Sequence, residues 1–455
     1  MKTMMNLRRP NRTWATRIAA PLMALALAGC AGGLFGGGKD DDETPTNGNR
    51  IPILSRIATD ISADPALANV TVVVPTATTN ETWPQAGGNA AKVAGHVTLS
   101  NNPARAWTAS ISGTTKTRRL AASPVVGAGK LFVVDTQAEI HAFDAQTGAR
   151  RWRHQIEVTG DLEDATFGGG AAYNEGRVYA TNGVGDVVAL DAETGAEIWR
   201  VKPAGPLRGG PTIAFNEVFV MTQDNQVFAL RTEDGAIVWQ RAAASGQSGV
   251  FGVAAPAAAQ GTVVAGFSTG ELVAYRYENG RELWSDALAR TSISTQVGTL
   301  TDVDADPIID QGRVYALGQG GRMAAYELLT GQRIWELTLA GISTPTVIGE
   351  WVFTLTDEAQ LLAIQRGTGR IRWITQLDRW RDAEDREGPI FWTGPVLASG
   401  RLWVASSRGY VKSLDVMTGE VFDFTRLDDG VSLPPVVANN MLYILDDKGR
   451  IHAYR

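Results

Sequence analysis

The side chains that could carry out chemistry are few, and their spacing matches no catalytic or metal-binding motif. Four histidines are scattered along the chain: His96, His141, His154 and His452. None of them stands in the HxxxH, HExxH or CxxCH spacings that bind zinc or haem. Asp302, Asp304 and Asp306 alternate as in a calcium loop, but the central glycine and distal glutamate of an EF-hand are missing. The sequence therefore predicts no catalytic residue, no metal site and no cofactor.

Cys30 is the only cysteine, so no disulfide can form within the chain. A basic stretch at 1–17 and an apolar run at 18–28 precede it, which is the order of a signal peptide. The apolar run is too short for a permanent membrane span. The residues LAG before Cys30 resemble the bacterial lipobox, in which the chain is cut before the cysteine and the thiol carries a diacylglyceryl group. We therefore expect Cys30 to be lipidated. Ala31, not Asp, follows it, which by resemblance to the bacterial sorting rule implies the outer membrane.

The composition is that of a globular β-rich protein that does not bind nucleic acid. Of the 455 residues, 44% are hydrophobic and 20% charged, and 50 glycines against 19 prolines indicate many tight turns. The formal net charge is −6, and five cations lie within the first 17 residues, so the exported body is expected to be more acidic still. An acidic body argues against nucleic-acid binding and against electrostatic docking on anionic lipid.

One phrase recurs along the body and defines a repeat. It reads DAQTGARRW at 144–152, DAETGAEIW at 191–199, RTEDGAIVW at 231–239, RYENGRELW at 276–284, ELLTGQRIW at 327–335 and QRGTGRIRW at 365–373. A seventh copy, DVMTGEVFDF at 415–424, has Phe in place of Trp. The glycine in each copy predicts a hairpin turn with positive φ. Alternating apolar strands around each turn give four strands per unit of 38 to 51 residues, the length of a propeller blade.

The two ends of the body complete an eighth unit. Residues 434–455 hold three strands without a fourth, and Ala104–Ile111 is a lone strand before the first full unit. Joining them closes the ring and leaves no open sheet edge. The predicted fold class is therefore all-β: an eight-bladed β-propeller with four antiparallel strands per blade, the last blade closed by an N-terminal strand. The expected organisation is a signal peptide at 1–29, a lipidated cysteine and flexible tether at 30–50, an N-terminal extension at 51–80 and the propeller at 81–455.

The repeated tryptophans are predicted to pack between blades and not to bind a ligand, because their placement is the same in every copy. They are Trp107, Trp152, Trp199, Trp239, Trp284, Trp335 and Trp373. Trp380 lies instead in a charged insertion at 379–388, where both a surface contact and an ordinary half-buried anchor remain open. His141 and His452 occupy equivalent third-strand positions, which favours a role in the repeat.

The repeated DxxTGxxxW phrase resembles the docking motif of quinoprotein dehydrogenases. With the lipobox and eight such blades, the chain resembles the BamB family, propeller lipoproteins of the bacterial β-barrel assembly (BAM) complex, over roughly residues 80–455. Two further stretches are similar to that family: PLRGGPTIAFNEVFV at 206–220 and LTDVDADPIID at 300–310.

The resemblance implies a partner and a binding site. In the BamB family these two loops dock on BamA, at its third POTRA domain, and the match places Leu207 and Arg208 in one contact and Asp302 and Asp304 in the other. Physically, a leucine beside an arginine supplies an apolar anchor and a charge fork, and two acids supply a complementary rim. The alternative is that Arg208 pairs with those aspartates within the propeller; both can hold together.

The function implied is a non-enzymatic, lipid-anchored scaffold at the periplasmic face of the outer membrane. It would bind BamA and other BAM subunits, and incoming barrel proteins could pair with its exposed strand edges. The competing hypothesis is a quinone-cofactor dehydrogenase on the same fold. Such enzymes are usually longer and often use an adjacent cysteine pair, whereas the only cysteine here is Cys30. A third hypothesis is a propeller lipoprotein that binds another envelope protein or a polysaccharide.

Overall fold

The structure is a computed structural model, and it describes residues 61–158, 160, 162, 165–243, 254–288 and 302–455. The predicted signal peptide, Cys30 and the predicted tether lie outside the described residues, as does the side chain of Arg208. The chain divides into two units, Met1–Ile57 and Ala58–Arg455, and the second contains all the described residues. Within the described part of the chain, no helix is long and apolar enough to cross a membrane.

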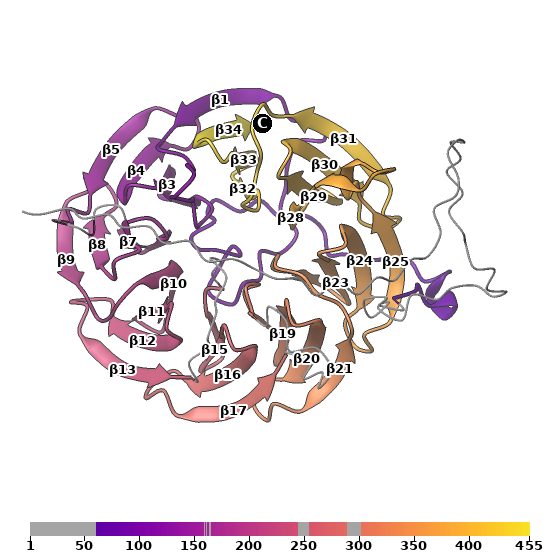
Figure 1. Ribbon diagram of the computed structural model, residues 1–455, viewed down its shortest axis with the longest axis horizontal. Coiled ribbons are helices and arrows are strands. Elements are labelled where there is room, and N and C mark those ends of the chain that lie inside the picture. Colours follow the sequence, from indigo (N-terminus) through magenta and orange to yellow (C-terminus); the bar gives the residue numbers. More distant parts are fainter. Residues whose placement is uncertain (1–60, 159, 161, 163–164, 244–253, 289–301) are drawn as a thin grey trace, which may run out of the picture. The chain divides into compact units, whose positions relative to one another are not determined.

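Eight four-stranded antiparallel sheets form a ring, which confirms the predicted eight-bladed propeller (Figure 1). Blades 1 to 3 are β2 (Val125–Gly127), β3 (Lys130–Val134), β4 (Glu139–Asp144) and β5 (Arg150–Gln155); β6 (Ala171–Asn174), β7 (Arg177–Thr181), β8 (Val187–Asp191) and β9 (Glu197–Val201); β10 (Leu207–Ala214), β11 (Glu217–Thr222), β12 (Gln226–Arg231) and β13 (Ile237–Ala242). Blades 4 to 6 are β14 (Ala257–Ala259), β15 (Thr262–Gly266), β16 (Glu271–Arg276) and β17 (Glu282–Ala287); β18 (Ile308–Asp310), β19 (Arg313–Gly318), β20 (Arg322–Glu327) and β21 (Arg333–Leu337); β22 (Thr346–Ile348), β23 (Trp351–Leu355), β24 (Gln360–Gln365) and β25 (Ile371–Gln376). Blade 7 is β28 (Trp392–Ala398), β29 (Arg401–Ser406), β30 (Tyr410–Asp415) and β31 (Val421–Arg426), and blade 8 is β32 (Val436–Ala438), β33 (Met441–Leu445), β34 (Arg450–Tyr454) and β1 (Arg105–Ser110).

The N-terminal strand β1 closes blade 8 as predicted. It pairs antiparallel with the last strand, β34, with Trp107 opposite Ala453 and Ser110 opposite Arg450. Because the fourth strand of this blade comes from the opposite end of the body, the ring cannot open between its first and last blades without breaking a sheet.

The repeated tryptophans join neighbouring blades, also as predicted. Trp107 of blade 8 lies over the turn glycine of blade 1, since a β-carbon on Gly148 would come within 2.5 Å of the indole ring. The indole nitrogen of Trp107 donates a hydrogen bond of 3.2 Å to the carbonyl of Ala145, just before that turn. The same contact recurs at later blades, for example from Trp284 to the carbonyl of Leu328. Each turn glycine therefore has two functions: it adopts a positive φ, and it makes room for the indole of the preceding blade.

The hydrophobic core is divided among the interfaces between blades. Phe132 of blade 1, for example, shares a buried cluster with Val178 and Leu190 of blade 2. The inner three strands of each blade are mostly buried. At the rim, the fourth strands of blades 2, 3 and 4 expose more than half of their side chains. This distribution is typical of sheets packed face to face around a ring.

The end of the N-terminal extension and the residues that follow it, up to 99, run around one end of the central channel (Figure 1). We call residues 72–99 the lasso segment. It forms backbone hydrogen bonds with the innermost strands or adjoining turns of blades 8, 1, 2, 4, 5 and 7, in that order along the segment. Blade 3 is contacted by the side chain of Gln85 instead. Its amide group donates a hydrogen bond to the carbonyl of Ile213 and accepts one from the backbone nitrogen of the same residue, both of 2.9 Å. Val72 packs into the core cluster of blades 6 and 7.

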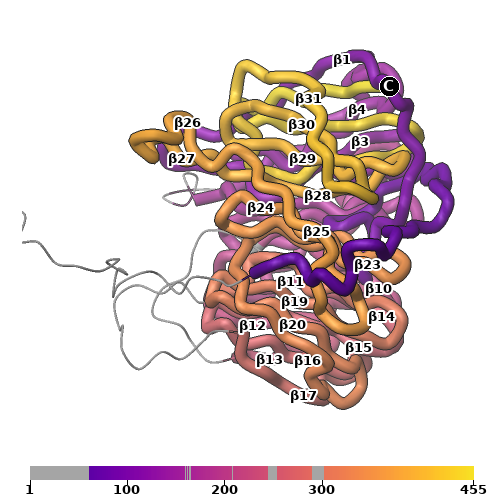
Figure 2. Tube along the Cα trace, turned by 90° about the vertical axis from the view of Figure 1, so that its right-hand side faces the viewer, coloured from indigo at the N-terminus to yellow at the C-terminus, as the bar shows by residue number. Residues whose placement is uncertain are grey.

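The two ends of the channel consequently differ (Figure 2). The sealed face carries the lasso segment and the turns between the first and second strands of each blade. The open face carries the connections from one blade to the next, such as 202–206, 338–345 and 377–391. The charged insertion at 379–388 projects from the open face as a hairpin of β26 (Trp380–Asp382) and β27 (Glu387–Pro389).

Candidate partner-binding face

Leu207 and Arg208 open the inner strand of blade 3 and do not form a loop. They pair with Thr222 and Met221 of β11, and an irregularity in the register follows before Thr212. Leu207 is buried among side chains of blades 2 and 3, so the expectation of an apolar loop anchor is wrong for its side chain. Sequence reasoning missed this because the strand begins six residues before its first consecutive apolar residues, Ile213 and Ala214. Leu207 can support a contact surface from beneath, while the backbone at Arg208 lies at the open-face end of the strand.

Asp302 and Asp304 precede the inner strand of blade 5. Asp302 is buried, and its carbonyl accepts a hydrogen bond of 3.0 Å from the backbone of Gln319. Asp304 is half-buried, and its carboxylate accepts a hydrogen bond of 2.8 Å from the side chain of the same glutamine. Of the two, Asp304 therefore offers the more accessible carboxylate. Both residues lie at the open face, next to the turn between β19 and β20.

The two predicted contacts lie near the same rim of the channel but not against each other. Blade 4 separates them, with its inner strand β14 between β10 of blade 3 and β18 of blade 5. Thr212 of β10 donates to the carbonyl of Pro256 at 2.7 Å, and the backbone of Ala255 donates to Asp306 at 2.7 Å, so one short stretch of blade 4 links both sides. A partner that touched both contacts would have to span one blade.

A buried lysine and a buried aspartate connect this rim to the lasso segment. Lys92 is fully enclosed; its ammonium group donates a hydrogen bond of 3.0 Å to Thr212 and interacts electrostatically with Asp306. Burial lowers the pKa of Lys92 and raises that of Asp306, and the opposite charge of the partner opposes each shift. The third aspartate of the TDVDADP stretch is thus an internal partner of the lasso segment. The sequence contains one indication of this arrangement, the glycine pair Gly87 and Gly88 before Lys92. In the structure both have positive φ, and a β-carbon on either would lie within 3.0 Å of a neighbouring residue.

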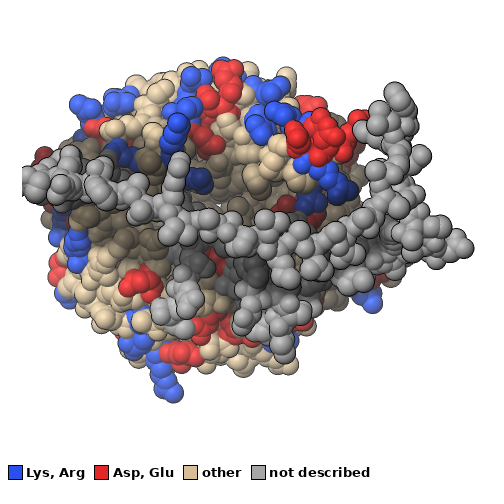
Figure 3. Space-filling view, in the orientation of Figure 1, with Lys and Arg blue, Asp and Glu red and all other residues tan. Residues whose placement is uncertain are grey.

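Acidic side chains form a cluster over the hairpin on the open face. In Figure 3, acidic side chains gather at the upper right, over β26–β27, and basic ones lie close by. The exposed acids of that hairpin are Asp382, Glu384, Asp385 and Glu387. Trp380 is half-buried, and the guanidinium group of Arg379 lies 5.3 Å from the centre of its ring. This arrangement suits recognition of a polar protein surface.

One group of described side chains brings metal-ligating atoms together, at Asp135, Glu139 and His141. It belongs to the turn between β3 and β4 and was not predicted, because its spacing matches no standard metal motif. The same turn in blade 8 holds Asp446 and His452, so the predicted repeat role of the two histidines is confirmed.

Taken together, these features define a class: an eight-bladed propeller of the quinoprotein-like type, with one end of its channel crossed by its own N-terminal segment. The family model for outer membrane protein assembly factor BamB matches residues 93–163 and 138–375. This chain therefore belongs to the BamB family.

Curated relatives agree. An outer membrane protein assembly factor BamB from Yersinia pestis is 25% identical over 358 residues, which is 78% of this chain and 89% of the relative. One from Vibrio cholerae is 30% identical over 353 residues, covering 77% of this chain and 88% of the relative.

Solved structures share the fold more widely. BamB from Moraxella catarrhalis matches with a TM-score of 0.61 at 20% identity, covering 78% of this chain and 99% of that structure. Quinohemoprotein alcohol dehydrogenase from Comamonas testosteroni matches with a TM-score of 0.63 at 14% identity, covering 83% and 81%. At these identities the likeness shows the fold alone, so the dehydrogenase match carries no argument for enzymatic activity.

Proposed function

We propose that this chain is a non-enzymatic scaffold of outer-membrane protein assembly, lipid-anchored through Cys30 at the periplasmic face of the outer membrane. Membership of the BamB family is the observation that carries the proposal. The structure is compatible with it, because a closed ring with a fixed core can present loops without changing shape. As a scaffold it would act by recognition, holding an assembly partner and incoming barrel proteins near each other.

The partner proposed is BamA, bound through its POTRA domains at the open face, with other subunits of the BAM complex joining the assembly. Arg208 and Asp304 would provide charged contacts on two sides of blade 4, and buried Leu207 and Asp302 would fix the backbone beneath them. Two separated contacts favour orientation of the partner over tight binding, since exposed ion pairs contribute little affinity each.

Incoming barrel proteins could use the outer strands. Their exposed residues include an aliphatic side chain just before the tryptophan in four consecutive blades: Ile198, Val238, Leu283 and Ile334. One hydrogen bond within the chain supports this proposal: at the outer strand of blade 6, the carbonyl of Ile371 accepts from the backbone of Asp64 at 2.8 Å. Backbone pairing of this kind gives affinity without requiring a particular sequence.

The test is a pull-down from detergent-solubilised membranes with this protein as bait, with bound proteins identified by mass spectrometry. The double variant Arg208→Ala with Asp304→Ala is compared with wild type. A matched control, Glu278→Ala with Arg281→Ala, removes one acid and one arginine from an exposed turn of blade 4 at the sealed face. Recovery of a POTRA-containing barrel protein by wild type and control, but not by the double variant, supports both role and site. Equal recovery by all three keeps the role and rejects these residues.

A further inference from the structure

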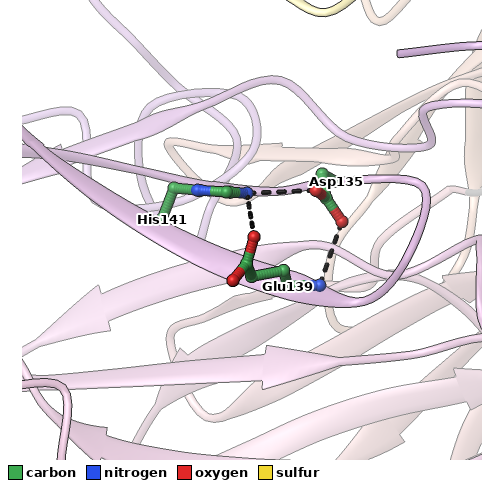
Figure 4. A group of neighbouring side chains, drawn as sticks. All are labelled: Asp135, Glu139 and His141. Carbon is green, nitrogen blue, oxygen red and sulfur yellow. Dashed lines mark hydrogen bonds and ion pairs between the residues drawn. The ribbon is translucent and has the colours of Figure 1, made fainter. Parts of the chain in front are cut away.

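Two carboxylates from one turn of blade 1 converge on a ring nitrogen of a histidine in the same turn (Figure 4). Asp135 follows β3, and Glu139 and His141 stand two residues apart on β4, so their side chains leave the same face of that strand. Nε2 of His141 lies 3.0 Å from a carboxylate oxygen of Asp135 and 3.4 Å from one of Glu139. The turn between second and third strands places this group at the open-face end of the blade.

Each carboxylate has one oxygen held by the protein and the other directed at the histidine. Oδ1 of Asp135 accepts hydrogen bonds from the backbone nitrogens of Gln137 and Glu139, at 2.8 and 3.0 Å, which leaves Oδ2 for the ring. Oε1 of Glu139 lies 3.4 Å from the guanidinium group of Arg153, which leaves Oε2 for the ring. Such outer contacts orient metal-binding carboxylates in known sites.

The cluster holds more negative charge than one imidazole can balance through hydrogen bonds. The side chains of Asp135 and His141 are 0% and 3% exposed, and that of Glu139 is 18% exposed. A neutral imidazole has one proton, so Nε2 can donate to Asp135 but not fully to Glu139 as well. The other ring nitrogen, Nδ1, is buried without a hydrogen-bond partner, as is Nδ1 of His452 in blade 8, so it does not distinguish the two blades. Tetrahedral zinc with ligand bonds of about 2.0–2.1 Å places neighbouring ligand atoms about 3.3 Å apart, close to both distances seen here.

Blade 8 contains the same turn without the third side chain. Asp446 and His452 repeat the six-residue spacing and the 3.0 Å contact, and the backbone of Arg450 donates to Asp446 as that of Glu139 does to Asp135. Arg450 replaces Glu139, however, and its guanidinium group faces Asp428 at 3.6 Å. The aspartate–histidine pair is thus a feature of the fold, and blade 8 shows that it needs no third group. Glu139 is what distinguishes blade 1.

We propose that Asp135, Glu139 and His141 bind a divalent transition-metal ion of the zinc class. One nitrogen and two carboxylate oxygens are ligands that zinc accepts, and three protein ligands leave the fourth position for water. Binding through Nε2 requires the neutral tautomer of His141 that carries its proton on Nδ1, so the proton on Nε2 moves to Nδ1 by exchange with solvent and the ring stays neutral. The partly exposed Glu139 gives the ion access, and its register partner Gln155 lines a neighbouring cavity of about 360 Å³. The site is independent of the proposed assembly role.

The experiment measures metal binding by the full-length, untagged protein in detergent after treatment with a chelator. Isothermal titration with Zn²⁺ and the visible absorption of added Co²⁺ report stoichiometry and a tetrahedral nitrogen and oxygen environment. We expect one ion per wild-type chain. Glu139→Arg, which copies blade 8, is expected to weaken binding at least about tenfold, and Asp446→Asn, a control in blade 8, to leave it unchanged.

The reciprocal variant sharpens the test. Arg450→Glu gives blade 8 the ligand set of blade 1, so two ions per chain are expected. Thermal unfolding in the presence of chelator monitors folding of each variant; should Glu139→Arg fail to fold, Glu139→Gln takes its place. No binding by wild type overturns the proposal. Binding that survives removal of Glu139 marks an adventitious ion only and overturns it as well.

Discussion

The two faces of this propeller are built on different principles. At the sealed face, the lasso segment is fixed by backbone hydrogen bonds to strands or turns from six blades, by a glutamine at blade 3 and by a buried lysine. At the open face, the connection between blades 6 and 7 forms an exposed, acidic hairpin, and blade 4 separates the two proposed partner contacts. The lasso segment therefore stabilises the ring as a whole, whereas changes at the open face touch one blade at a time.

This difference indicates which face of the propeller can tolerate changes of sequence. A segment that contacts every blade transmits any local loss to the whole ring, because its contacts form only when all the inner strands are in place. A hairpin between two blades can change sequence with little cost to the core. Four substitutions can break or sharpen the comparison.

The largest effect is expected for Trp83→Ala in the lasso segment. Trp83 is 4% exposed, packs in the core between blades 7, 8 and 1, and exchanges two backbone hydrogen bonds with Val126. Removing the indole should cost about 3–5 kcal/mol, measured as the free energy of unfolding in urea. Val73→Ala is the matched control, because Val73 belongs to the same segment but is 68% exposed. Equal losses in both variants would show that the cost does not come from core packing.

The second effect concerns the electrostatic interaction between buried Lys92 and buried Asp306. Lys92→Met keeps most of the side-chain volume but leaves Asp306 enclosed without its cation. Removing one partner of a buried pair typically costs about 3 kcal/mol or more. Adding Asp306→Asn should recover part of the loss, since the remaining side chain is then neutral. The unfolding free energies of wild type, both single variants and the double variant form the cycle that measures this coupling. Additive losses would mean that the two side chains do not act as a pair.

The third effect depends on pH. Burial raises the pKa of Glu217 to about 7 from its usual 4.5, and its Oε2 atom has no hydrogen-bond partner. A raised carboxyl pKa means that the folded protein binds the proton more tightly, so this contribution to stability is full below pH 4.5 and is lost as the pH rises through 7. Glu217→Gln should therefore stabilise by about 1–2 kcal/mol at pH 8 and by almost nothing at pH 4. Thermal unfolding at both values checks this, and an equal gain at pH 4 would contradict it.

The ring was predictable from the sequence because its information is local and repeated. Gly148 and its equivalents reveal each turn, the tryptophan four residues later reveals each outer strand, and the strand at 104–111 reveals the closure. These signals depend on neighbours within ten residues, which is the range that periodicity and turn chemistry can cover.

The lasso segment was not predictable for the opposite reason. Asn80 bonds to Val437, 357 residues away, and no local pattern encodes such a contact. Likewise, the burial of Leu207 depends on side chains of blade 2, so a motif that looked like a loop is part of a strand. The residues around His141 can be read in the sequence, but their proximity depends on the turn that brings Asp135 back against the strand.

The smallest effect on stability is expected at the open-face hairpin, with Trp380→Ala. The ring is only half-buried, with the guanidinium group of Arg379 over it, so the loss should stay below about 1 kcal/mol. Thermal unfolding measures that value, and the pull-down described above measures whether partner recovery falls with it. Little change in stability with reduced recovery would place the hairpin within the binding surface. A loss as large as that of Trp83→Ala would instead show that the hairpin supports the core. An element of the open face would then be as necessary to the ring as the lasso segment is. The contrast between the two faces would therefore fail.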